Sequence, residues 1–181
     1  MDPDAFNCAS AAALMDGEYA SAKECIDKAR DRAAEGSTDL LYAEGNEAMR
    51  LFLLEEYDAA VRQCESVQRQ MTTALGKNHI DTVNIQYCKG LCHARLEQYD
   101  DAVDAFNATI HNFTGAHCHQ AYVDLVATLS LQRRYEEACR HAEASYTACL
   151  AEYGYERSET FEAVDILVRV HCMAAEVLKL Y

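Results

Sequence analysis

The segment Leu96-Glu97-Gln98-Tyr99-Asp100-Asp101-Ala102 recurs in altered form along the chain. In every copy a tyrosine is followed three residues later by an alanine, and an apolar residue stands seven positions after the tyrosine. Offsets of three and seven residues share one face of an α-helix. The repeat tyrosines are 38, 42 and 36 residues apart, a period typical of stacked helical hairpins; they are Tyr19, Tyr57, Tyr99 and Tyr135.

The glycines show a second period. Gly36, Gly76, Gly115 and Gly154 are 40, 39 and 39 residues apart, each near the expected end of a helix that begins at a repeat tyrosine. Glycine is common just past the last turn of a helix, because it adopts the left-handed backbone conformation without strain. The two periods agree. We therefore predict an all-α fold, a right-handed superhelical array of about four antiparallel helical hairpins plus a C-terminal capping helix.

The predicted boundaries describe a single repeat domain over residues 1–181. Its repeats are expected at about 4–36, 38–76, 79–115 and 117–154, with the capping helix at 158–180. That helix carries Val164, Leu167 and Val168 in one stripe, which is expected to cover the fourth hairpin. Because the chain ends in further apolar residues, an oligomer or assembly contact through this helix is a further expectation.

The composition argues against several classes of partner. The formal net charge is −14, from 30 acidic and 16 basic residues, whereas nucleic acid and anionic membranes attract basic surfaces. No signal peptide is recognised, and no apolar run approaches the ~18 residues of a membrane span. Nine cysteines are spread along the helices, which favours reduced thiols and a cytoplasmic location.

The repeats resemble tetratricopeptide repeats, since they combine Tyr-x-x-Ala, an apolar residue four positions further on and the hairpin period. The segment from Ala74 to Thr82, ALGKNHIDT, resembles the Leu-Gly-x-x-His-Pro-x-Thr joint of kinesin-light-chain-like repeats. Gly154 and Thr160 repeat its Gly-to-Thr spacing of six residues. The resemblance covers about residues 8–180, but Ile80 or Ser158 replaces the proline of the joint.

The resemblance implies a non-enzymatic adaptor or scaffold that binds a peptide or helix of a protein partner. Proteins of this kind use a concave groove lined by the first helix of each hairpin. Two arginines in this groove favour a ligand that carries an acid near a large apolar residue. An alternative is that Phe52, Leu53 and Leu91 belong to the core. The expected groove residues are Asn46, Met49, Phe52, Leu53, Tyr87, Leu91, Arg95, Asp124 and Arg169.

Co-chaperone versions of this fold grip a terminal carboxylate with paired lysine and asparagine side chains. Here only Asn46 matches, and Tyr42 stands where the neighbouring lysine belongs. Because a buried carboxylate needs paired donors, we do not expect such a clamp. A rival function is a structural subunit buried in a larger assembly, of a cytoskeletal or motor-associated kind.

A small metal-dependent enzyme is a third hypothesis. It rests on the ligand types His111, His117, Cys118 and His119, with Cys149 expected nearby in the hairpin. The spacing matches no common zinc motif, so we expect a solvated turn, and no metal or cofactor. Cys88 and Cys92 lie one helical turn apart and are expected to be small buried apolar residues. No catalytic triad or phosphate loop is found, and enzyme activity is not expected.

Overall fold

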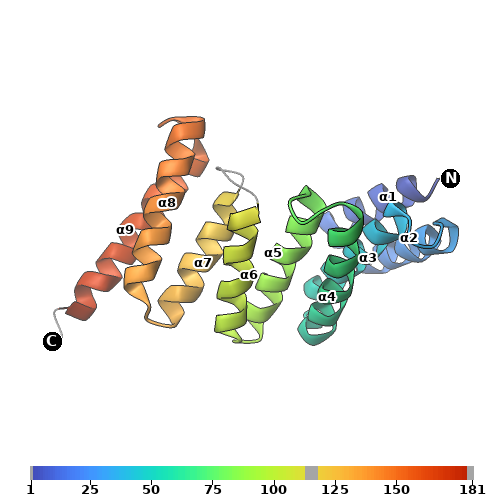
Figure 1. The fold of residues 1–181 in the computed structure, drawn as a ribbon, viewed down its shortest axis with the longest axis horizontal. Helices are drawn as coiled ribbons and strands as arrows, with labels where there is room; N and C mark the ends of the chain where they lie inside the picture. Colours follow the sequence, from blue (N-terminus) through green and yellow to red (C-terminus); the bar gives the residue numbers. More distant parts are fainter. Residues whose placement is uncertain (1, 113–117, 179–181) are drawn as a thin grey trace. The chain divides into compact units, whose positions relative to one another are not determined.

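The computed structural model describes residues 2–112 and 118–178; Gly115 and His117 lie outside the described residues. The described residues form helices and no strand, as the two periods predicted. Figure 1 shows them as α1 (Pro3–Met15), α2 (Tyr19–Arg32), α3 (Thr38–Leu53), α4 (Tyr57–Ala74), α5 (Ile80–Arg95), α6 (Tyr99–Asn112), α7 (His119–Leu131), α8 (Tyr135–Tyr153) and α9 (Ser158–Leu178).

The four repeat tyrosines are the first residues of α2, α4, α6 and α8. Two positions before each tyrosine the backbone is left-handed: φ is 76° at Gly17, 63° at Glu55, 59° at Glu97 and 60° at Arg133. Left-handed backbone is uncommon for residues with a side chain. One turn geometry therefore opens the second helix of each repeat, and it is kept where glycine is absent.

The glycines end helices much as predicted. Gly154 is the residue that follows α8, with φ of 75°, and Gly76 follows the end of α4 with φ of 96°. Gly36 is also left-handed, but α2 already ends at Arg32. The helix is shorter than predicted because the backbone of Ala33 is extended, which breaks the hydrogen-bond ladder before the glycine is reached.

The described helices fall into two compact units, Met1–Leu96 and Glu97–Tyr181. The first holds α1 to α5 and the second holds α6 to α9. The predicted third hairpin would pair α5 with α6, which belong to different units. That pairing, and the single continuous array, stay predictions, and each unit is considered by itself below.

In the N-terminal unit, α3 packs against α1, α2, α4 and α5. The core side chains of α2, α3 and α4 are almost completely buried. Leu41 and Ala48 are the residues by which α3 contributes to the cluster that it shares with α4 and α5. The chief apolar contributions are Ile26, Leu41, Cys64, Val67 and Met71. First helices thus contact one another, α1 with α3 and α3 with α5, while α2 and α4 complete the hairpins.

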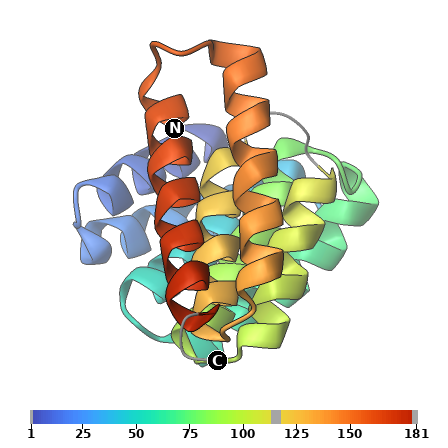
Figure 2. The ribbon, with the colours of Figure 1, turned by 90° about the vertical axis from the view of Figure 1, so that its left-hand side faces the viewer.

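In the C-terminal unit, α8 and α9 run antiparallel side by side, as Figure 2 shows. The buried side chains of α9 are Thr160, Ala163 and Val170. The stripe predicted to face the fourth hairpin was therefore wrong, because Val164 is 38% and Val168 is 55% exposed. The buried face of α9 is rotated by about one residue from the predicted one. Neighbouring helical residues point about 100° apart, so a shift of one residue turns a stripe away from the core.

The pH dependence of stability gives a test of the packing of α8. His141 is half-buried there, with its ring centroid 6.3 Å from that of Tyr122. Burial lowers the pKa of His141, although Glu137 opposes this. The unfolded chain then binds more protons than the folded chain as pH falls, so the contribution of His141 to stability decreases below about pH 6.5.

We therefore expect wild-type protein to lose more stability between about pH 7 and about pH 5 than the variant His141→Gln. Urea unfolding at a series of pH values measures the difference, and glutamine keeps a polar side chain without the proton site. Parallel curves for the two proteins would show that the burial of His141 does not affect its titration.

None of the described helices combines the length and the apolar composition of a membrane span. All nine cysteines are free thiols, and five of them are buried.

Candidate functional site: a cleft along the first helices

A cleft of about 800 Å³ runs along α1, α3 and α5 of the N-terminal unit. Its size lies within the range of about 300–1,000 Å³ that is usual for ligand-binding pockets. Except for Met71 of α4, every lining residue comes from a first helix. They are Asp4, Asn7, Cys8, Ala11, Leu14, Met15, Tyr42, Gly45, Asn46, Met49, Leu53, Met71, Asp81, Asn84, Ile85, Tyr87 and Cys88.

Small residues keep the cleft open. Ala11 and Gly45 face it from α1 and α3. A Cβ atom at Gly45 would lie 3.2 Å from Ile85 Cδ1 and 3.7 Å from Met71 Cε. The absence of a side chain thus lets α3 approach its neighbours closely. We conclude that larger residues here would narrow the cleft and push α5 away.

The interior of the cleft is largely apolar. Leu14, Met71 and Ile85 are buried and form its floor, and the half-buried Met49 and Leu53 stand above them. Two aromatic side chains, Tyr42 and Tyr87, add wide surfaces with a polar end. This mixture suits a ligand with one or two bulky apolar groups. The flexible methionine side chains of the cleft can adapt to the shape of such groups.

Asparagine and serine side chains fasten α1 to α3 at the cleft. The Asn46 Nδ2 group donates to Ser10 Oγ at 2.8 Å and to the carbonyl of Asn7 at 3.1 Å. Asn7 Nδ2 donates to the carbonyl of Asp39 at 2.8 Å. Among the described residues, the buried Oδ1 atom of Asn7 is an acceptor with no partner. Because an unpaired buried acceptor is unfavourable, it is a ready partner for a donor in the cleft.

The charged residues that line the cleft, Asp4 and Asp81, are both acidic. Burial, followed by the nearby carboxylate of Asp81, raises the pKa of Tyr42, and Asp39 and Asp4 add to the effect. Asp81 also lies 3.3 Å from His79 Nδ1. The polar part of the cleft is thus rich in acceptors and negative charge, and favours a ligand that donates or is cationic.

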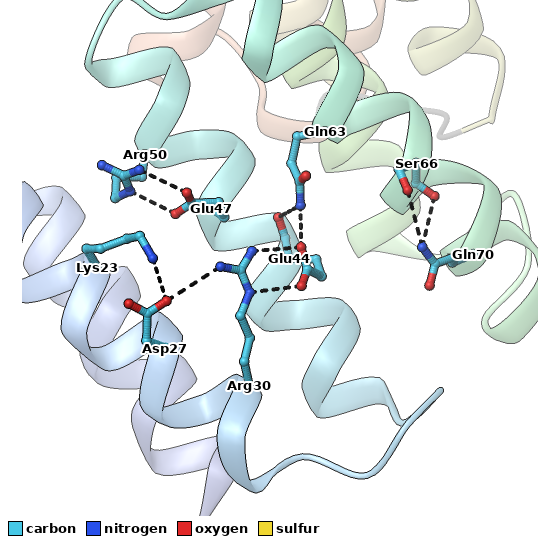
Figure 3. Close-up of polar contacts among 9 residues, drawn as sticks. All are labelled: Lys23, Asp27, Arg30, Glu44, Glu47, Arg50, Gln63, Ser66 and Gln70. Atoms are coloured by element: carbon cyan, nitrogen blue, oxygen red, sulfur yellow. Dashed lines mark hydrogen bonds and ion pairs between the residues drawn. The ribbon is translucent and has the colours of Figure 1, made fainter.

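A polar network on the opposite side of α3 holds that helix in place (Figure 3). Arg30 of α2 donates to both carboxylate oxygens of Glu44, at 2.9 and 2.8 Å, and Gln63 of α4 donates to the same carboxylate. Glu47 and Arg50 form a second two-bond pair, at 2.8 and 2.9 Å. Bidentate pairs of this kind fix geometry, so α2 and α4 together orient the face of α3 that lines the cleft.

The cleft brings together four of the nine predicted groove residues: Asn46, Met49, Leu53 and Tyr87. The amide group of Asn46 donates within the fold, to Ser10 and to the carbonyl of Asn7. The binding role of all four residues remains a prediction.

The other five predicted residues lie elsewhere. Phe52 packs against the core, with its ring centroid 5.7 Å from that of Tyr57, as the alternative for this residue anticipated. Leu91 is half-buried and Arg95 exposed, and neither lines the cleft. Asp124 and Arg169 belong to the C-terminal unit, where Arg169 pairs with Asp165 at 2.9 Å. The cleft therefore lacks the arginines from which an acidic ligand was expected.

Our sequence reasoning missed the contribution of α1. The spacing of 38 residues between Tyr19 and Tyr57 already indicated which residues of α1 correspond to those of α3. A shift by 38 residues carries Asn46, Met49 and Leu53 onto Cys8, Ala11 and Met15, all of which line the cleft. The residues of α1 were overlooked because they are small and alanine-rich, and so suggested no binding surface.

In the described part of the predicted His/Cys loop, Cys118 and His119 are buried, so the expectation of a solvated turn was wrong for these two residues. His119 is buried, with Nδ1 3.2 Å from Ser145 Oγ and 3.6 Å from Cys149 Sγ, and Nε2 3.1 Å from Glu162. Cys149 does lie near His119, as expected. His111 is exposed at the end of α6. His119 thus links α7 to α8 and α9 by hydrogen bonds.

We expect the protein, purified without chelator, to carry less than one zinc ion per chain. Elemental analysis checks this. A full equivalent of zinc that disappears in the double variant His119→Ala, Cys149→Ser would contradict the assignment of His119 as a structural residue, because four converging ligands form a closed zinc site.

Similarity to known structures supports the fold. No protein-family model matches the chain, and no curated protein matches it in sequence. The chain is similar to crystal structures of nearly identical TPR-like repeats of the kinesin light chain type from Podosopora anserina, and of a single-residue variant of them. For both, the TM-score is 0.80 at 12% identity, over 97% of this chain and 88% of that chain.

At this identity the similarity shows the fold: the chain is a TPR-like repeat protein, as its tyrosine motif and joints predicted.

Proposed function

We propose that the protein is a non-enzymatic adaptor that binds a peptide or helical segment of a partner protein in the cleft along α1, α3 and α5. One observation carries the proposal: the first helices of the N-terminal unit form a largely apolar cleft of about 800 Å³. A cytoplasmic location is part of the proposal, since the thiols are free.

The lining also suggests the chemistry of the ligand. Tyr87, Met49 and Leu53 offer an apolar seat, and the nearby charges, Asp4 and Asp81, are negative. A segment with a large apolar residue next to a lysine or arginine complements both features. The apolar anchor supplies most of the affinity, and the charges chiefly set the rate and orientation of association.

Selection of peptides from a random displayed library on the full chain tests the proposal. We expect enriched peptides to combine an apolar residue with a neighbouring basic residue. Tyr87→Ala should weaken their binding by about 1–3 kcal/mol with an unchanged helical signal. Asp81→Asn should have a smaller effect that shrinks as salt rises, because exposed charges are screened.

Two variants serve as controls. Thr72→Ala alters an exposed residue of α4 outside the cleft and should leave binding unchanged. Phe52→Ala should reduce stability more than affinity, since Phe52 packs on the core. Peptides that bind equally well to wild type and Tyr87→Ala would place the interaction outside the cleft and refute the proposal.

A second candidate function, a structural subunit of a larger assembly of a cytoskeletal or motor-associated kind, rests on a separate observation. The outer face of α9 exposes Phe161 by 63%, Val168 by 55% and Val164 by 38%. Apolar residues at this helical spacing form a surface that a partner helix can cover. In that case Phe161→Asp should abolish co-purification with the assembly and leave peptide binding in the cleft intact.

A further inference from the structure

Three cysteine side chains converge where α4 packs on α5, next to the cleft. Cys64 comes from α4, and Cys88 and Cys92 stand one turn apart on α5. Their Sγ atoms all lie within 4.8 Å of one another, and among the described residues this is the group whose geometry suits an ion. None is more than 1% exposed. The sequence suggested small packing residues at Cys88 and Cys92, and did not anticipate Cys64 beside them.

The cleft gives access to this group of three thiols. Cys88 is one of the lining residues of the cleft, and Cys64 and Cys92 lie behind it. A small neutral solute in the cleft therefore lies next to Cys88, and a local opening of the helices exposes the sulfur of this residue, which is 1% exposed at rest. A hydrated anion is disfavoured on the same path, because the charged residues that line the cleft, Asp4 and Asp81, are both acidic.

The thiols also differ in acidity. Hydrogen bonds with Cys64 and Cys92, and then burial, raise the pKa of Cys88. Hydrogen bonds from Cys64 and Cys88 lower the pKa of Cys92.

We propose that Cys64, Cys88 and Cys92 form a binding site for a trivalent, thiol-reactive element of the arsenic(III) class. Arsenous acid is a small neutral molecule at neutral pH. Each thiol attacks arsenic, an As–S bond forms, an As–O bond breaks, and the thiol proton leaves with the hydroxyl as water. Three such steps convert arsenous acid and three thiols into a tris-thiolate and three waters. Arsenic stays trivalent throughout, and no oxidant is needed.

Charge selects this class over the common thiol-binding metals. Three thiolates carry three negative charges, which a trivalent centre neutralises in full. Zinc(II) or copper(I) bound to three thiolates would leave net charge in a cluster of Leu41, Val67 and Met71, where unpaired charge is strongly unfavourable. The three Sγ atoms already lie within 4.8 Å of one another, so one centre with bonds of about the zinc–sulfur length of 2.3 Å can reach all three after a small adjustment.

The test uses the full chain, reduced and then freed of reductant, with sodium arsenite as the probe. After gel filtration we expect one arsenic per chain by elemental analysis. X-ray absorption of this complex should show arsenic bound to three sulfurs and no oxygen. Arsenic bound to fewer than three sulfurs and to oxygen would overturn the proposal. This measurement is made on the wild-type protein and does not depend on the folding of a variant.

Single variants localise the site. Cys64→Ala, Cys88→Ala and Cys92→Ala should each weaken arsenite binding at least tenfold, with helical content monitored by circular dichroism. Cys25→Ala, on α2 outside the cleft, and Cys172→Ala, on α9, are matched controls that should bind as wild type does. Loss of binding in either control, or stoichiometric zinc(II) or copper(I) binding without arsenic binding, would overturn the assignment.

Discussion

Replacing Phe106 with alanine is expected to lower the free energy of unfolding by about 3–5 kcal/mol. Phe106 lies on the buried face of α6 with 0% exposure, and it is the largest of the fully buried side chains in the described part of the chain. The loss combines the transfer of the ring to water with the cavity that remains, since closely packed helices relax only in part. Urea unfolding followed by circular dichroism measures it.

Phe161→Ala is the matched control for this experiment. Phe161 belongs to α9 of the same unit but is 63% exposed. We expect its replacement to change stability by no more than about 0.5 kcal/mol, as for most surface substitutions. A loss below about 1 kcal/mol for Phe106→Ala would contradict the core position of that ring.

Val170→Lys is expected to destabilise the protein by about 3–5 kcal/mol, because it would place an unpaired charge in the core. Val170 is 0% exposed on the side of α9 that faces the other helices of its unit. Loss of packing between α8 and α9 should also expose apolar surface, including Tyr146 and Tyr153, and promote aggregation. Thermal unfolding and light scattering measure the two effects.

Val168→Lys, two residues away, separates the observed register from the one predicted from the sequence. Val168 is 55% exposed, so a lysine there keeps its ammonium group in water and should change stability by about 0.5 kcal/mol or less. The predicted stripe through Val164 and Val168 requires the opposite order. A larger loss of stability for Val168→Lys than for Val170→Lys would show that the register predicted from the sequence is the correct one.

Local sequence signals located the helices well. α8 begins at a repeat tyrosine and ends one residue before Gly154, as predicted, and the other repeat tyrosines also open their helices. Such signals succeed because the hydrogen bonds and turn geometry of a helix involve residues only a few positions apart. The end of α2 was misjudged for the same reason, since the extended backbone of Ala33 overrode the signal of Gly36.

Assignments of helix faces were less accurate. Leu53 lines the cleft, whereas its neighbour Phe52 packs on the core, although the two are apolar and adjacent. Hydrophobicity marks a broad stripe on each helix but does not say which edge of it meets a neighbour and which meets solvent. On α5 the groove was assigned to Tyr87, Leu91 and Arg95, and only Tyr87 lines the cleft.

The periodic tyrosines and glycines were sufficient to predict a TPR-like array of helical hairpins, because helix formation and turn geometry depend on short stretches of chain. The ligand chemistry of the cleft and the convergence of thiols depend on tertiary structure. Cys64 lies beside Cys88 and Cys92 only because α4 packs on α5. Likewise, Asn7 meets Asn46 only because α1 packs on α3. These contacts join residues far apart in the sequence, and no periodic pattern specifies the depth or rotation with which one helix packs against another.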